Sequence, residues 1–243
     1  MTNTPRILVG IPVYNEAIYV DAVLDEVSHF ADDVLVVDDG STDDTPVRLA
    51  ERSVDVIRHP ENRGYGRAMQ EMLRRADADG YEWLVTMDCD LQHEPAAIPR
   101  FVERMEMGDA DVISGSRYLQ SHDGDDPPPM DRRAINAAIT EQLNDRLGMC
   151  LTDAFCGFKA YRIAATRGLS LDVDGYDFPM QFWVQAHHAG LRIVEIPVRL
   201  IYHDPTRTFG GPLDDSGNRR SVYESTICRE LLRCGSADVL VRG

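Results

Sequence analysis

Residues 82–93 read EWLVTMDCDLQH, an apolar run that ends on two aspartates, Asp88 and Asp90, separated by one residue. The run Glu82–Met87 is short and, after its first residue, apolar except for Thr86, which is typical of a strand buried inside a parallel sheet. Two carboxylates at the end of such a strand can share one hard divalent cation together with phosphate oxygens and water. A solvated turn or a helix cap can contain the same pair, so its meaning depends on the rest of the chain.

Similar apolar runs recur on both sides of this segment and alternate with amphipathic stretches about every 25 residues, which favours a parallel sheet with right-handed crossovers. We therefore expect an α/β fold, with a mostly parallel central sheet and helices on both faces. The predicted strands of the first half are Arg6–Pro12, Val34–Val37, Val54–Ile57, Glu82–Met87 and Asp111–Gly115; the predicted helices lie near Val20–Val27, from Ser41 or Thr42 to Leu49, and over Tyr65–Ala76 and Ala96–Met107.

The second half is less regular. Gln120–Met130 contains three successive prolines and is expected to be a mobile loop. Further strands are predicted at Phe155–Tyr161 and Ile193–Tyr202, and helices after Asp131, near Pro179–Ala189 and over Arg219–Leu232. Asn15, Ser41 or Thr42, and Asp131 are the predicted caps of the helices that follow them. We expect a single domain over residues 1–243, with a first half at about 6–118, a second half at about 131–211 and a C-terminal helix within 212–243.

One predicted helix carries an apolar residue at every fourth position. These residues are Ile135, Ile139, Leu143 and Leu147. Core packing explains such a stripe best, and surface contact with a lipid acceptor or a partner protein is the alternative.

The composition excludes several classes of protein. The chain has 243 residues, is 43% apolar and carries a net charge of −16, so it is neither disordered nor built to bind nucleic acid through a basic surface. No apolar run approaches the roughly 20 residues that a membrane span needs, and Met1–Arg6 does not resemble a signal peptide. We expect a soluble cytoplasmic protein, with peripheral contact at the cytoplasmic membrane face or a membrane partner left open.

The charged residues are unevenly chosen. Of the basic residues 24 are Arg and one is Lys159, and 28 of the acidic residues are Asp. This surface suits a salt-adapted or high-GC source, although an ordinary acidic cytosolic protein fits as well. The five cysteines include no pair with the spacing of a zinc site, so neither a zinc site nor a disulfide framework is expected.

Two other predicted strands also end on polar residues, which parallel pairing brings to the same sheet edge. After the first strand comes PVYNE, where Tyr14 can stack on a base and Glu16 can accept hydrogen bonds from a sugar or base. After the second comes DDGSTD, where Asp39 can accept a base N–H. The alternative is that these two segments are helix caps followed by acidic residues in the first helical turn, with no ligand involved.

Taken in order, these motifs resemble the inverting family 2 glycosyltransferases of GT-A fold, and most closely the dolichyl- or polyprenyl-phosphate sugar synthases. The resemblance covers roughly residues 6–203. It implies that the half at about 6–118 binds the nucleotide sugar and that the half at about 131–211 is the acceptor half. It continues through NRGYGRA at 62–68, DCDLQH at 88–93, GSRY at 115–118 and TDAFCGFKAYR at 152–162.

The resemblance implies transfer of mannose or glucose from a GDP- or UDP-hexose to a polyprenyl or dolichyl phosphate, with inversion and with Mg²⁺ or Mn²⁺ as cofactor. Its site residues, carried over to this chain, fall into three groups. Pro12, Tyr14, Glu16, Asp39 and Asp88 would bind the nucleotide sugar, Asp88, Asp90 and Gln92 the metal, and Arg117 with Arg132 or Arg133 the acceptor phosphate. Asp90, Asp153 and Arg117 are the candidate catalytic residues, and Asp153 would either act as a base or brace the site.

The chain departs from the family pattern at three places. Cys89 and Cys156 replace small residues, and the segment 201–211 lacks the lysine of the corresponding loop. We expect Arg207 in that segment to clamp the diphosphate. Membrane contact would fall to Ala134–Leu147 or to the arginines of the last helix, which are Arg219, Arg220, Arg229 and Arg233.

Three alternatives remain at this point. The same fold and donor could serve a soluble or glycan acceptor. A sugar nucleotidyltransferase is disfavoured because the chain lacks a glycine- and basic-rich triphosphate loop near its first strand. A non-catalytic binder of nucleotide sugars is disfavoured by the intact pair of Asp88 and Asp90.

Overall fold

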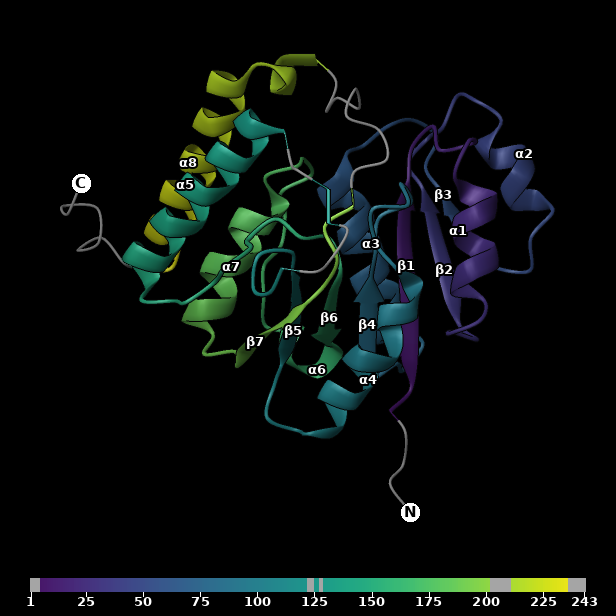
Figure 1. The fold of residues 1–243 in the computed structure, drawn as a ribbon, viewed down its shortest axis with the longest axis horizontal. Helices are drawn as coiled ribbons and strands as arrows, with labels where there is room; N and C mark the ends of the chain where they lie inside the picture. The colour runs from purple at the N-terminus through teal and green to yellow at the C-terminus, as the bar shows by residue number, and fades with distance from the viewer. Residues whose placement is uncertain (1–4, 122–124, 127–128, 202–210, 236–243) are drawn as a thin grey trace.

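The computed structural model describes residues 5–121, 125–126, 129–201 and 211–235. Within these residues the strands form one mixed sheet, and helices cover both of its faces (Figure 1). The strands are β1 (Ile7–Val13), β2 (Val34–Asp38), β3 (Asp55–Arg58), β4 (Trp83–Thr86), β5 (Val112–Ser116), β6 (Lys159–Arg162) and β7 (Ile193–Pro197). The helices are α1 (Val20–Val27), α2 (Thr45–Ala50), α3 (Tyr65–Ala78), α4 (Ile98–Glu106), α5 (Met130–Leu147), α6 (Ile163–Thr166), α7 (Phe178–His188) and α8 (Ser216–Arg233), with short 3₁₀ turns η1 (Pro95–Ala97) and η2 (Gly211–Asp214).

The strand order in the sheet is β3-β2-β1-β4-β6-β5-β7. All neighbours are parallel except β6, which runs antiparallel to both β4 and β5. The register places Thr86 of β4, Lys159 of β6 and Ser114 of β5 side by side. Because one reversed strand separates them, β4 and β5 point the same way and end at the same edge. The expectation of a mostly parallel sheet in an α/β fold is confirmed.

Side chains along each inner strand alternate between two apolar cores, one on each face of the sheet. Leu8, Leu35 and Leu84 face the core built with α3, α5, α7 and α8. Val9 and Val36 face the second core, which is built with α1 and α4. Burial on both faces explains why the strands read as continuous apolar runs instead of alternating ones.

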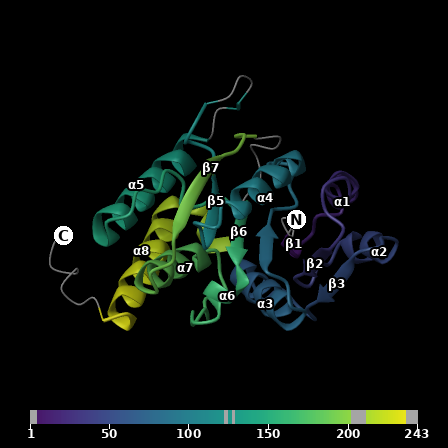
Figure 2. The same cartoon turned by 90° about the horizontal axis from the view of Figure 1, so that it is seen from below.

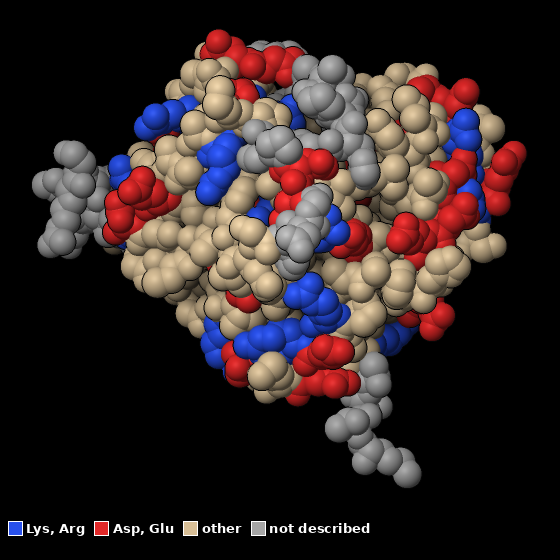
Figure 3. Space-filling view, in the orientation of Figure 1, with Lys and Arg blue, Asp and Glu red and all other residues tan. Residues whose placement is uncertain are grey.

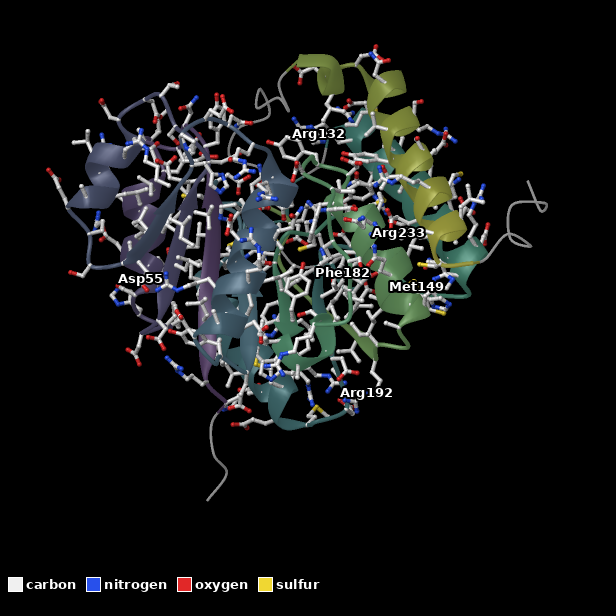
Figure 4. The ribbon with its side chains drawn as sticks, turned by 180° about the vertical axis from the view of Figure 1, so that it is seen from behind. Asp55, Arg132, Met149, Phe182, Arg192 and Arg233 are labelled. Carbon is white, nitrogen blue, oxygen red and sulfur yellow. The ribbon has the colours of Figure 1, made fainter. Side chains whose placement is uncertain are left out.

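Helices α5, α7 and α8 pack on one another beyond the β7 half of the sheet (Figure 2). Phe182 of α7, labelled in Figure 4, meets the Tyr161 ring of β6 edge to face, with 5.0 Å between the ring centroids. The apolar stripe of α5 lies inside this layer, with all four residues buried: Ile135, Ile139, Leu143 and Leu147. The core-packing interpretation of the stripe is therefore right, and the surface-contact alternative is wrong for these residues.

The predicted helix caps are wrong. Asn15 does not cap α1, which begins five residues later; its backbone is left-handed, with φ of 58°. Its Oδ1 instead accepts hydrogen bonds from the N–H groups of Thr42 and Asp43, at 2.8 and 3.3 Å. Neither Ser41 nor Thr42 caps α2, since that helix begins at Thr45, whose N–H donates to Asp43 Oδ1 at 2.9 Å. These side chains join the loops after β1 and β2 to each other.

Three predicted boundaries in the second half also move. Asp131 lies in the first turn of α5 and is not its cap, because the helix begins at Met130. The strand predicted at Phe155–Tyr161 begins only at Lys159. Before it, the N–H of Phe155 donates to Asp153 Oδ1, and the carbonyl of Gly157 accepts the hydroxyl of Thr86 in place of a backbone N–H. The strand predicted at Ile193–Tyr202 ends at Pro197, a residue without the N–H that a ladder needs.

The arginines of α8 do not form a free basic cluster. Each lies within 3.3 Å of a carboxylate: Arg219 of Asp131, Arg220 of Glu224, Arg229 of Glu230 and Arg233 of Asp172. A carboxylate beside each guanidinium weakens the attraction to an anionic lipid surface, and basic membrane contact through this helix stays a prediction. Among the described helices, none combines the length and apolar character that crossing a membrane would require.

Truncation of the α5 stripe tests its burial. We expect Leu143→Ala to lower the free energy of unfolding by about 2–5 kcal/mol, because it removes a fully buried side chain and leaves a cavity. Glu141→Ala, on the exposed side of the same helix, is the matched control and should stay within about 0.5 kcal/mol. Urea denaturation measures both, and equal effects would contradict the packing described here.

Candidate functional site

Four strands carry the candidate residues at their carboxyl ends. The chain enters β1 from the bottom of Figure 1, so β1, β2 and β4 end at the upper edge of the sheet. Strand β5 ends there as well because it runs parallel to β4. The loops after these strands hold the segments 14–16, 39–43, 88–93 and 117–118. The fold therefore brings together the segments that the sequence predicts to share one crevice.

The segment after β4 presents its carboxylates outward. Cys89 is 2% exposed and packs in the core, whereas Asp88 and Asp90 on either side are half-buried. Asp90 Oδ1 accepts the N–H of Gln92 at 3.1 Å, and Leu91 between them has a φ of 58°. This tight turn gathers two carboxylates and one amide side chain at the strand end. Such a set of oxygen donors fits a hard divalent cation whose other ligands are phosphate oxygens and water.

The carboxylate of Asp88 lies against Gly157. A Cβ built on Gly157, in the loop before β6, would lie 2.3 Å from Asp88 Oδ2 and 2.7 Å from Oδ1. The carbonyl of Gly157 in turn accepts a hydrogen bond from Thr86 Oγ1 at 2.8 Å. The missing side chain therefore leaves the space that the Asp88 carboxylate occupies.

His93 holds the backbone of the same segment. Its Nδ1 accepts the N–H of Asp88 at 3.0 Å, and its Nε2 lies 3.9 Å from Cys156 Sγ. Burial lowers the pKa of His93, but the contact with Cys156 and the charges of Asp88 and Asp90 outweigh burial and raise the pKa to about 9. A proton on Nδ1 would break the bond to Asp88. We therefore assign the hydrogen bond to the neutral ring, with its proton on Nε2, which is the form present above that pKa.

The expected nucleotide-binding residues of β1 lie beside the second loop. Pro12 is paired with Val37 of β2, and the Tyr14 ring is 44% exposed. Glu16 is buried, and its N–H donates to Thr45 Oγ1 at 2.9 Å. Tyr14 is thus accessible to a base or sugar, whereas the buried Glu16 links the loop after β1 to the start of α2.

Asp39 is 4% exposed and is largely used by the protein itself. Its Oδ2 accepts the N–H of Gly64 at 2.8 Å; its Oδ1 accepts the N–H of Arg63 at 2.9 Å and lies 2.6 Å from His59 Nδ1. A carboxylate has about four acceptor positions, so room for one further donor remains. That this donor is a base N–H stays a prediction.

Arg117 and Asp153 form a buried, two-pronged ion pair. Arg117 Nε lies 2.7 Å from Asp153 Oδ2 and Nη2 lies 2.9 Å from Oδ1. Burial opposes the charge of Asp153, but Arg117 outweighs it and lowers the carboxyl pKa. A carboxylate that is 1% exposed and this acidic is a poor base, so the geometry favours the bracing role of Asp153 over the basic one.

The ring of Tyr118 brings two arginines together. The guanidinium carbon of Arg133, from the first turns of α5, lies 3.7 Å from the ring centroid, and that of Arg117 lies 5.6 Å from it. Arg132, labelled in Figure 4, is half-buried at the end of the molecule where α8 begins. Arg207 lies outside the described residues.

The sequence reasoning missed two residues of this region. His59 follows β3, and nothing in its local sequence marks it as a partner of Asp39. Lys159 is 3% exposed at the centre of the sheet; its Nζ donates to the carbonyl of Cys156 and lies 5.3 Å from the Trp183 ring centroid. Burial lowers its pKa. The one available signal was that Lys159 is the only lysine of the chain.

Comparison with known proteins agrees with this geometry. The family model described as glycosyl transferase family 2 matches residues 8–169. An undecaprenyl-phosphate mannosyltransferase from Micrococcus luteus is 34% identical over 206 residues, which cover 81% of this chain and 84% of that protein. A polyprenol monophosphomannose synthase from Mycolicibacterium smegmatis is 31% identical over 80% of this chain and 77% of that protein.

A solved structure has the same fold. Glucosyl-3-phosphoglycerate synthase from Mycobacterium tuberculosis, in complex with Mn²⁺, uridine diphosphate and glucosyl-3-phosphoglycerate, superposes with a TM-score of 0.72. The match covers 95% of this chain and 80% of the other at 22% identity, and this likeness bears on the fold alone. The expected GT-A fold is confirmed.

The ion pair of Asp153 gives a pH-dependent prediction. We expect Asp153→Asn to cost about 3–5 kcal/mol at neutral pH, because it leaves the Arg117 charge buried and unbalanced. The lowered pKa means that Asp153 stabilises the fold above its unfolded pKa and loses this effect as the pH falls. The difference between wild type and variant should therefore be constant from pH 8 to 5 and shrink below about pH 4.

Chemical denaturation at several pH values measures this difference. The matched control is Asp77→Asn, which breaks the exposed pair with Arg167 and should cost at most about 1 kcal/mol. An equal cost for the two variants, or a difference that does not change in acid, would contradict the assigned pair.

Proposed function

The chain belongs to glycosyl transferase family 2 and is a glycosyltransferase, and we propose that it moves a hexose from a nucleoside-diphosphate sugar to a polyprenyl phosphate. The observation that carries the proposal is the shared edge of β4 and β5, where Asp88 and Asp90 follow one strand and Arg117 follows the other. Cation-binding and anion-binding groups at one edge suit a reaction in which a diphosphate leaves and a phosphate attacks. Two relatives named for undecaprenyl-phosphate and polyprenol substrates support this acceptor class.

We propose that Asp88, Asp90 and Gln92 hold Mg²⁺ or Mn²⁺. Their half-buried positions, and the room that Gly157 leaves for the Asp88 carboxylate, fit a cation bound jointly by protein and diphosphate. When bound, the ion would neutralise charge on the leaving diphosphate.

For the donor, Pro12 and Tyr14 would line the base pocket, and Asp39 would offer its remaining acceptor position to a base N–H. Uracil and guanine both have such a donor, so UDP- and GDP-hexoses are both candidates. Glu16 would support this pocket from its buried position between the loops after β1 and β2. Arg207 is proposed to clamp the diphosphate.

For the acceptor, Arg117 would offer the guanidinium N–H groups that Asp153 leaves unused, with Arg132 and Arg133 beside it. In the inverting displacement, a phosphate oxygen attacks the anomeric carbon as the bond to the diphosphate breaks. The second pKa of a phosphate monoester is near 6, so the acceptor is largely dianionic at neutral pH and needs orientation more than deprotonation.

Of the three alternative functions, one remains. A soluble or glycan acceptor keeps the same donor side and is separated only by assay. A sugar nucleotidyltransferase or a non-catalytic binder no longer fits, because the chain is a family 2 glycosyltransferase.

We also propose a cytoplasmic protein with peripheral contact at the membrane face or with a membrane partner. On the face shown in Figure 3, the coloured acidic and basic side chains form small interleaved patches. Such a surface favours contact through the acceptor lipid itself over broad attraction to anionic lipid.

The direct test supplies GDP- and UDP-hexoses with Mn²⁺ or Mg²⁺ and polyprenyl phosphate in detergent, and measures lipid-extractable sugar. We expect transfer with release of nucleoside diphosphate, loss of transfer in a chelator, and recovery when metal returns. Asp90→Asn should lower kcat about a hundredfold or more, because the diphosphate loses part of its charge stabilisation.

The matched control is Asp79→Asn, a surface carboxylate that pairs with Arg75 far from the edge; it should keep wild-type kcat. Release of pyrophosphate would refute the reaction. Transfer to a soluble phosphate ester or a glycan, with none to the lipid, would replace the acceptor.

The space beside Gly157 gives a separate metal-binding prediction. Gly157→Ala should push the Asp88 carboxylate aside and weaken Mn²⁺ binding about tenfold, as loss of one charged ligand contact implies. Isothermal titration with Mn²⁺ and nucleoside diphosphate measures the affinity, and thermal unfolding of the metal-free protein checks the fold. Gly148→Asn, at a position with open space and a φ of 66°, is the control. Unchanged affinity in Gly157→Ala would argue against Asp88 as a ligand.

A further inference from the structure

Glu195 of β7 reaches away from its own strand to the loop before β6. One carboxylate oxygen, Oε2, accepts the N–H of Thr152 at 2.8 Å and its Oγ1 at 2.9 Å. The other, Oε1, accepts the N–H of Asp153 at 3.1 Å. A single side chain therefore binds three donors on two consecutive residues.

The flanking residues of the same loop are held from a different direction. The N–H of Leu151 donates to Asn144 Oδ1 at 2.9 Å, and the N–H of Ala154 donates to Thr140 Oγ1 at 3.3 Å, both on α5. Residues 151 and 154 are thus fixed by α5, and the two residues between them by Glu195.

This loop leads directly to the proposed acceptor arginine. Asp153 binds Arg117 through both carboxylate oxygens, and Asp153 Oδ2 also accepts the Arg117 N–H at 3.2 Å. Thr152 Oγ1 lies 2.5 Å from Ser116 Oγ, at the end of β5. The contacts run without a gap from β7, through residues 152 and 153, to the residue that follows β5.

We propose that Glu195 is a positioning residue for the acceptor side: it fixes Asp153, and Asp153 in turn sets the direction in which Arg117 presents its remaining N–H groups. The inference rests on the proposed function, because it takes Arg117 as the group that receives the acceptor phosphate. Neither Glu195 nor Thr152 belongs to the predicted site.

The chemistry requires a carboxylate at this position. Both oxygens of Glu195 accept N–H donors, so a glutamine of the same shape must turn its own NH₂ toward one of them. A donor that faces a donor inside the protein costs a hydrogen bond and moves the loop. Burial raises the pKa of Glu195, whereas its three donors favour the ionised form that the contacts need.

The test compares Glu195→Gln with wild type and with Glu141→Gln, which removes one carboxylate from the exposed face of α5. We expect the KM for polyprenyl phosphate to rise about tenfold in Glu195→Gln, as the loss of one hydrogen bond to a charged group implies. The KM for the donor sugar and the slow hydrolysis of the donor without acceptor should stay within twofold. A merely structural defect would instead weaken donor binding and slow donor hydrolysis as well as raise the acceptor KM.

A second pair of variants covers a failure of Glu195→Gln to fold. Thr152→Ser keeps the hydroxyl that donates to Glu195 and should behave as wild type. Thr152→Val keeps the shape of the side chain but lacks the hydroxyl that donates to Glu195. It should raise the acceptor KM in the same way as Glu195→Gln.

Amide hydrogen exchange separates this inference from the proposed function. Exchange at Thr152 and Asp153 should become faster in Glu195→Gln and stay unchanged in Glu141→Gln, whatever the acceptor is. Unchanged exchange would overturn the inference. Faster exchange with an unchanged KM, for the acceptor that wild type uses, would overturn its link to Arg117; absence of transfer to polyprenyl phosphate by wild type would refute the proposed function alone.

Discussion

The reversed strand β6 is the constraint on which the candidate site depends. It lies between β4 and β5 and runs against both, so these two strands end at the same edge although they are not neighbours. The loop that leads into β6 then has to pass between the two strand ends. That loop carries Asp153, which meets Arg117, and Gly157, which leaves room for Asp88. One reversed strand thus brings three distant parts of the chain into contact.

The sequence was sufficient for those features that repeat along the chain. Strands with both faces buried are mostly apolar, so the sequence predicts the strands of the first half to within one residue at each end. The apolar stripe likewise identifies the buried side of α5. The convergence of residues 12–16, 38–41 and 88–92 followed from the rule that parallel strands end together. Their motifs also identified the family.

The interactions between those segments were not predictable, because a hydrogen bond between distant loops has no sequence period. Asn15 has the composition of a helix cap, yet it binds the loop after β2. Asp39 is predicted to accept a base N–H, yet in the structure its carboxylate accepts the N–H groups of Arg63 and Gly64. The sequence allows Asp153 to act as a base or to brace the site, and only its contact with Arg117 favours the bracing role. In each case the side chain had an equally good local use, and packing of remote loops selected the other.

The placement of Lys159 has a consequence for the electrical behaviour of the whole surface. The chain has no other lysine, and this one is enclosed between the sheet and Trp183. Apart from the terminal amine, the permanent positive charges exposed to solvent are therefore all guanidinium groups, which keep their proton above pH 12. In most proteins the surface amines of lysine deprotonate at about pH 10, and their positive charge is lost. This molecule keeps the guanidinium charges of its surface there, so the change of its net charge in alkali comes mainly from thiols and phenols, with smaller parts from the terminal amine, Lys159 and His93.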